Sequence, residues 1–268
     1  MLLRIRCKLK GMSVMADLEM RVAVAKVPRY GDRESGDTLE TIERPGGGFS
    51  FVLVDGQGNG RSAKTLSHLV ATRAITLLKD GARDGAVARA VHDYLYTYRM
   101  GQASATLNIL SVDFASSKIL VTRNNPAPFF VITPQELRSF NTPSTPIGLH
   151  PLIRPQISEI PIAAYTYVVL FTDGLLRAGE RRGEDLGLPN YLAAWPAHEG
   201  RDPQTLVDSI MNQALELDDG QPVDDMSIVV LGILPVSGVP GLRRMTVSAP
   251  IIATGQYEPP DEPEMVDE

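Results

Sequence analysis

Hydrophobic and polar positions repeat with two different periods along this chain. Short runs rich in Val, Ile, Leu, Phe and Tyr are typical of strands, and they occur at residues 20–27, 49–54, 105–112, 118–123, 128–132, 165–171 and 226–233. Apolar residues spaced three and four apart predict amphipathic helices at 62–79, 84–98 and 203–217. Both kinds of element are therefore abundant.

The order of these elements separates the fold classes. Strands come first, and two helices, a run of strands, one helix and a last strand follow, which is not the regular alternation of a doubly wound parallel sheet. The order favours an α+β layered fold in which consecutive strands pair antiparallel. Turn residues at 113–117 and 124–128 further predict a meander over residues 105–140.

Length and composition predict one main domain with extensions at both ends. The 268 residues, 43% of them apolar, suffice for one sizeable core, which we place at residues 16–235. Residues 1–15 are predicted to be a loose or disordered N-terminal extension outside the fold, because Met12 and Met15 offer alternative starts. Residues 236–268 end in a Pro-rich acidic tail that predicts disorder. Gly, Pro and charged residues at 179–201 indicate an inserted flap.

Charge and cysteine content exclude several classes of partner. The net charge of -6, without a Lys/Arg-rich run, argues against electrostatic binding of nucleic acid or an anionic membrane. No apolar stretch approaches the roughly 20 residues of a membrane span. The single cysteine, Cys7, excludes an internal disulfide and a multi-cysteine zinc site. Since the N-terminus lacks the long apolar region of a signal peptide, we expect a cytoplasmic protein.

Aspartates at the ends of strand-like runs are the candidates for chemistry. They are Asp37, Asp55, Asp173 and the adjacent pair Asp224 and Asp225, each beside turn residues. A single Asp-Gly is a common turn dipeptide, but several at the edge of one sheet repel each other unless a cation lies among them. Oxygen ligands without nearby His or Cys favour Mg²⁺ or Mn²⁺ over zinc. A pair of such ions suits the hydrolysis of phosphate esters.

The glycines at 56–60 (GQGNG) raise an alternative, a loop that binds the phosphates of a nucleotide through backbone amides. The spacing is G-x-G-x-G rather than G-x-G-x-x-G, and no Walker lysine follows it. About 40 residues of predicted helix come next, instead of a short strand–helix–strand unit. The glycines are therefore interpreted as the frame around Asp55.

Six segments, taken in order, resemble a known family. They are "SGD" at 35–37, "VDGQGNGRSA" at 54–63, "ATLNILSVD" at 105–113, "TPIGL" at 145–149, "LFTDGLLRA" at 170–178 and "DDMSIVVL" at 224–231. Their order and spacing resemble the metal-dependent protein serine/threonine phosphatases (PPM, or type 2C), in the bacterial branch typified by stage II sporulation protein E. The resemblance covers about residues 20–235. It implies a four-layer αββα sandwich of two mainly antiparallel sheets flanked by helices.

The resemblance also implies a metal centre with two divalent ions, Mn²⁺ or Mg²⁺. Asp55 matches the bridging aspartate, and the carbonyl of Gly56 and the carboxylate of Asp37 match further ligands of one ion. Asp173 and Asp224 match the ligands of the other ion. Asp55, Asp173 and Asp224 would then act in catalysis through a metal-activated water. A glycine after the bridging aspartate is also physically reasonable, because such a turn leaves little room for a Cβ.

Two positions depart from the family pattern. Asn124 and Asn125 lie where many relatives have a histidine, and none of the four histidines belongs to a catalytic constellation, so we assign no general-acid histidine. Ser227 replaces the usual threonine and keeps its hydroxyl.

The function implied by the resemblance is hydrolysis of phosphoserine or phosphothreonine on a regulatory protein, such as an anti-sigma-factor antagonist or a stress-signalling scaffold. The alternative is a pseudophosphatase that binds a phosphoprotein without turnover, and the intact carboxylates argue against it. The helical region 62–98, which follows the Asp55 loop, is the expected surface for a dimer or a regulatory partner.

Overall fold

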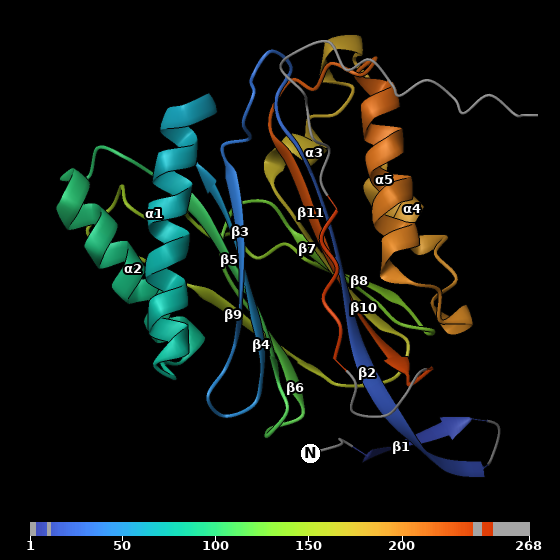
Figure 1. Ribbon diagram of the computed structural model, residues 1–268. Helices are drawn as coiled ribbons and strands as arrows, with labels where there is room; N and C mark the ends of the chain where they lie inside the picture. Colours follow the sequence, from blue (N-terminus) through green and yellow to red (C-terminus); the bar gives the residue numbers. More distant parts are fainter. Residues whose placement is uncertain (1–3, 10–11, 238–242, 249–268) are drawn as a thin grey trace, which may run out of the picture. The chain divides into compact units, whose positions relative to one another are not determined.

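The computed structural model describes residues 4–9, 12–237 and 243–248 (Figure 1). The chain divides into two compact units, Met1–Ser237 and Gly238–Glu268. All described helices and strands belong to the first unit, and residues 243–248 of the second form neither. Most of the acidic tail, from residue 249 onward, lies outside the described residues, and so does the disorder predicted for it.

The first unit contains strands and helices in the order that the sequence pattern predicts. The strands are β1 (Arg4–Leu9), β2 (Met12–Val27), β3 (Asp37–Glu43), β4 (Gly48–Gly56), β5 (Ala105–Asp113), β6 (Lys118–Asn124), β7 (Phe129–Ile132), β8 (Leu137–Phe140), β9 (Gln156–Pro161), β10 (Thr166–Phe171) and β11 (Met226–Pro235). The α-helices are α1 (Gly60–Lys79), α2 (Asp84–Arg99), α3 (Asp173–Leu176), α4 (Leu188–Ala193) and α5 (Pro203–Leu217), with 3-10 turns at Glu180–Arg182 and Ala197–Glu199.

These strands form two antiparallel sheets. One has the order β1-β2-β11-β10-β7-β8 and the other the order β3-β4-β5-β6-β9. Helices α1 and α2 cover the outer face of the five-stranded sheet, and α4 and α5 cover the outer face of the six-stranded sheet (Figure 1). The predicted α+β fold, a four-layer αββα sandwich, is confirmed.

Three apolar layers hold the sandwich together, and strand alternation decides which residue enters which layer. On β4, Leu53 packs between the sheets, whereas Val52 and Val54 pack under α1 and α2. On β10, Val168 and Leu170 face the other sheet, and Tyr167 and Val169 face the outer helices. Successive side chains point to opposite faces of a strand, so every second residue near a strand end faces the interior between the sheets.

The helix predictions are confirmed, but the predicted meander is wrong in its second half. Strands β5 and β6 form a hairpin of the five-stranded sheet, whereas β7 pairs with β10 and β8 in the other sheet. The chain therefore crosses between the sheets after Asn124. Four strands escaped the pattern, because β1 lies in the segment predicted to be an extension, β3 and β9 are mixed in composition, and β8 has only four residues.

Residues 179–201 do not form a free flap. Two 3-10 turns and α4 fold this segment onto the six-stranded sheet, where Leu188, Leu192 and Ala197 are buried in the outer apolar layer. Gly and charge in the sequence suggested looseness, but the apolar residues between them pack.

The predicted domain limits lie close to strand ends. Strand β2 runs without interruption from Met12 across the predicted start at residue 16, and β11 ends at Pro235. The limits themselves stay predictions. In the described part of the chain, no helix combines the length and the apolar character needed to cross a membrane.

Candidate metal centre

Four predicted aspartates lie at one end of the sandwich. Asp37 begins β3 and Asp55 lies near the end of β4, and the two are direct partners in the five-stranded sheet. In the six-stranded sheet, Asp173 follows β10 and Asp224 precedes β11, and the amide of Thr172 donates to the Ser227 carbonyl where these strands meet. Both sheets therefore contribute carboxylates to the same end.

Strand alternation turns these side chains toward the space between the sheets. Leu39 and Leu53 pack there, so Asp37 and Asp55, each two residues away on the same strand, face the same layer. The exposure rises from Asp37, which is fully buried, through the half-buried Asp55 to Asp173, which is exposed. The centre therefore opens to solvent on the Asp173 side.

The carboxylate of Asp37 is held by the opposite sheet. Its Oδ2 accepts hydrogen bonds from the hydroxyls of Thr172, at 2.9 Å, and Ser227, at 2.6 Å. Its Oδ1 is buried and has no partner within the described residues. Burial raises the pKa of Asp37 to about 7, against the effect of the two hydroxyls. A buried carboxylate oxygen without a donor is costly, and a cation would satisfy it.

The other three aspartates lie close enough to Asp55 for their charges to act on it. Burial is the largest cause that raises its pKa, and the negative charges of Asp37, Asp173 and Asp224 raise it further. Like charges this close disfavour each other's ionisation. The ligand set, oxygen without His or Cys, fits Mg²⁺ or Mn²⁺.

The carboxylates are within electrostatic range without being arranged as a finished coordination shell. Over residues 4–9, 12–237 and 243–248, no three His, Cys, Asp or Glu side chains are grouped closely enough to hold an ion together. The residues fit a divalent cation by their chemistry and burial.

Helix α1 is fastened to the centre at close range. A Cβ on Gly56 would lie 2.3 Å from the Ala63 carbonyl oxygen, so the helix backbone passes directly over this glycine. Lys64 donates to the Asp37 carbonyl at 2.8 Å, and the Ser67 hydroxyl donates to the Gly36 carbonyl. A Cβ at position 56 has little room, as predicted, because the backbone of α1 occupies that space.

Asp224 and Asp225 have separate surroundings. Asp225 is buried and accepts hydrogen bonds from the amides of Arg29, at 3.0 Å, and Gly36, at 2.9 Å. Asp224 is more exposed, its charge acts on Asp55, and its Oδ2 accepts from Arg177 at 2.6 Å. Asp224 therefore faces the centre, and Asp225 braces the loop before β3.

Sequence reasoning missed two functional neighbours of the aspartates. Thr172 donates to the Asp37 carboxylate, and Arg177 binds Asp224. Strand alternation would have identified Thr172, because it lies two residues after Leu170, which faces the space between the sheets. Arg177 has no such signal, because its contact depends on the turn made by α3.

The histidines take no part in the centre. His92 is a buried residue of α2 and accepts a hydrogen bond from the Gly148 amide, and His68 is exposed beside Glu40. The Asn124 amide donates to the Thr145 carbonyl, and the Asn125 amide donates to the Phe171 carbonyl. The two asparagines thus tie down loops at the end of the sandwich.

The fold defines a class of protein. The chain superposes on the structure of the PP2C phosphatase domain and a fragment of the regulatory domain of the cell fate determinant SpoIIE from Bacillus subtilis, with a TM-score of 0.70 and 20% identity, over 80% of this chain and 63% of that one. It also superposes on RsbX in complex with magnesium, with a TM-score of 0.61 and 15% identity, over 82% of this chain and 100% of that one. The architecture is that of a PP2C phosphatase domain.

The family follows from the sequence. The model of the family "Stage II sporulation protein E (SpoIIE)" matches residues 45–234, and the chain belongs to this family. Stage II sporulation protein E of Bacillus subtilis (strain 168) is 20% identical over 210 residues, which are 78% of this chain and 25% of that protein. The protein of the same name from Priestia megaterium is 21% identical over 215 residues, 77% of this chain and 35% of that protein. The chain thus spans only a quarter to about a third of these relatives.

Proposed function

We propose that the protein is a metal-dependent protein phosphatase that hydrolyses phosphoserine or phosphothreonine on a regulatory protein. The observation that carries this proposal is the convergence of carboxylates from both sheets around Asp37, whose buried Oδ1 lacks a partner. The PP2C fold and membership of the SpoIIE family support it.

The proposed ligands divide between two divalent ions, Mn²⁺ or Mg²⁺. Asp37, Asp55 and the carbonyl of Gly56 would hold one, and Asp55, Asp173 and Asp224 the other. When bound, the two ions supply the positive charge that binds a phosphoryl group and activates a water for attack on phosphorus. The magnesium in the related RsbX structure supports a divalent cation in this fold.

The chain's own residues set the shape of this centre. Thr172 and Ser227 fix the Asp37 carboxylate across the two sheets, so that its Oδ1 alone is left for a ligand. Arg177 holds Asp224 at the solvent side. Since Asp173 is exposed, a phosphorylated side chain on a protein surface can approach from solvent without a buried channel.

The proposed substrate is a phosphorylated regulatory protein, such as an anti-sigma-factor antagonist or a stress-signalling scaffold, in the cytoplasm. Residues 62–98, which include most of helices α1 and α2, are the proposed surface for a dimer or a regulatory partner. Their link to catalysis would be the contacts of α1 with Gly56 and with the Asp37 carbonyl.

The decisive experiment removes the bridging carboxylate. In Asp55→Asn, we expect Mn²⁺-dependent hydrolysis of p-nitrophenyl phosphate to fall about a hundredfold or more, and Mn²⁺ binding measured by calorimetry to weaken, because the shared ligand is lost. Asp93→Asn makes the same chemical change on the exposed face of α2 and should leave both unchanged. Retained activity in Asp55→Asn would refute the metal centre. Tight Mn²⁺ binding by the unmodified protein without hydrolysis would indicate a phosphoprotein-binding protein without turnover.

A further inference from the structure

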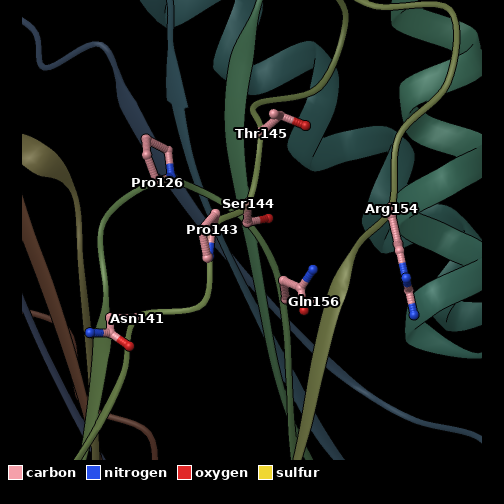
Figure 2. Close-up of a pocket in the computed structure, with 7 residues that line it drawn as sticks. All are labelled: Pro126, Asn141, Pro143, Ser144, Thr145, Arg154 and Gln156. Atoms are coloured by element: carbon pink, nitrogen blue, oxygen red, sulfur yellow. The ribbon is translucent and has the colours of Figure 1, made fainter.

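A pocket of about 470 Å³ lies beside the metal centre and contains none of its aspartates. Three segments line it: the crossover after β6, the chain after β8, and the start of β9 (Figure 2). Its lining consists of Pro126, Asn141, residues 143–145, Arg154 and Gln156. The volume is that of a site for a side chain or a small ligand.

This pocket opens at the same end of the sandwich as the aspartates. Strand β4 ends at Asp55 and Gly56, and in the antiparallel five-stranded sheet β6 ends and β9 begins at that same end. Three steps across the sheet lead from β4 to β9. At about 4.8 Å a step, the start of β9 is about 14 Å from Asp55.

A row of polar residues connects the two places. Thr106 is the sheet partner of Asp55. Two residues further along β5, Asn108 pairs with Arg123 of β6, and Arg123 pairs with Gln156 of β9, which lines the pocket. By strand alternation all four face the space between the sheets, as do their neighbours Leu110 and Val121. Thr106 Oγ1, both amide atoms of Asn108 and Arg123 Nε are buried without a partner in the described residues.

Arg123 is the unusual member of this row. It is 2% exposed, and its guanidinium donates only to the carbonyls of Asn125, Ala127 and Thr142. Its own carbonyl accepts from the Ser144 hydroxyl at 2.7 Å. Arg123 therefore fixes both the crossover and the chain after β8, which are two walls of the pocket. A buried guanidinium without a bonded carboxylate also leaves positive charge beside the pocket.

Arg154 supplies a second positive charge at the surface. It is exposed, and within the described residues it forms no ion pair or hydrogen bond. Among the described residues that line the pocket, Arg154 alone carries a charge. In the view of Figure 2 it stands across the pocket from Pro126 and Asn141.

We propose that this pocket binds an acidic side chain of the phosphoprotein substrate, through Arg154, while the phosphorylated residue lies at the aspartates. The inference rests on the proposed phosphatase function and adds a determinant of its substrate choice. An extended peptide advances about 3.3 Å per residue, so a separation of about 14 Å corresponds to about four residues. The preferred substrate therefore carries Asp or Glu about four positions from the phosphoserine.

The test compares phosphoserine peptides that are neutral elsewhere and carry Glu or Ala four positions before or after the phosphoserine. With the unmodified protein and Mn²⁺, one of the two Glu peptides should have a kcat/KM about threefold to tenfold above its Ala counterpart, which is typical of one charge-assisted contact. Arg154→Gln should abolish that preference and leave hydrolysis of p-nitrophenyl phosphate unchanged. Arg154→Glu should reverse the charge preference, so that a peptide with Lys at the same position has a higher kcat/KM than the Glu peptide.

Arg83→Gln is the matched control, because it removes one exposed arginine that precedes α2 and does not line the pocket. It should keep the preference for the Glu peptide. Equal kcat/KM for Glu and Ala peptides with the unmodified protein, or a preference that survives Arg154→Gln, would overturn the inference. Fluorescence anisotropy of labelled peptides measures the same preference as a Kd. A protein without hydrolysis but with an Arg154-dependent Kd would therefore refute the phosphatase activity and keep the pocket.

Discussion

At the scale of single residues, the adjacent aspartates Asp224 and Asp225 have the same side chain but different surroundings. Both carboxylate oxygens of Asp225 accept hydrogen bonds, one from the backbone amide of Arg29 and the other from that of Gly36. Asp224 instead bonds its own neighbour's amide and Arg177, and its charge acts on Asp55. One aspartate therefore serves the fold and the other serves the centre.

Substitution by asparagine should separate these two roles. Asp225→Asn offers only one carbonyl oxygen to two amide donors, so we expect the free energy of unfolding to fall by about 1–3 kcal/mol in urea denaturation. Asp224→Asn should change stability little and weaken Mn²⁺ binding measured by calorimetry. If Asp225→Asn weakens Mn²⁺ binding more than Asp224→Asn does while both fold normally, the ligand is Asp225.

At the scale of elements, the contact between α1 and the end of β4 decides how the centre is built. The helix backbone passes so close that only a glycine fits at position 56, with the Ala63 carbonyl in the way of any side chain. Polar bonds from Lys64 and Ser67 fasten the same helix to the loop before β3. A shift of α1 would therefore move Asp55 and the Asp37 carbonyl together.

Adding one methyl group tests this contact. Gly56→Ala should displace α1, lower the free energy of unfolding by about 2 kcal/mol or more, and reduce metal-dependent hydrolysis. Gly46→Ala is the control, because a Cβ there meets no atom within 4 Å, and its effect should stay within about 1 kcal/mol. Thermal unfolding and urea denaturation measure both variants. A Gly56→Ala protein as stable as Gly46→Ala would show that α1 is not packed as described.

At the scale of the whole molecule, the carboxylates at the centre make the stability of the unit Met1–Ser237 depend on pH and on bound metal. The pKa of Asp37 is raised to about 7 by burial, and that of Asp55 is raised by burial and by its acidic neighbours. An ordinary carboxyl has a pKa of about 3.9. The folded metal-free protein therefore keeps protons that the unfolded chain releases, and its stability falls as pH rises from about 4 through these raised pKa values.

We therefore expect the Tm in chelator to be lower at pH 8.5 than at pH 6, and Mg²⁺ to raise the Tm more at pH 8.5, where the carboxylates are ionised. Differential scanning fluorimetry gives both values. In the double variant Asp37→Asn with Asp55→Asn, the effect of Mg²⁺ should disappear and the dependence on pH should flatten. If the Tm of this variant depends on pH as much as that of the unmodified protein, other titratable groups cause the dependence.

Much of this protein is determined by its sequence alone. Periodicity located α1, α2 and α5 and most strands, because a helix or a strand with one buried face imprints that face on the sequence. The aspartates stood out because strand ends and turn residues are local features. Ordered motifs gave the family resemblance and, with it, the sandwich.

Other features were decided only by the tertiary structure, because they depend on residues far apart in the chain. Strand β3 has weak apolar alternation and forms because β4 pairs with it. The crossing from β6 to β7 follows from the sheet partners of each strand. Thr172 and Ser227 meet Asp37 across 135 and 190 residues, and Arg123 reaches the pocket walls through backbone carbonyls. Such contacts involve no periodic pattern, since they arise where two sheets are stacked and their ends face each other.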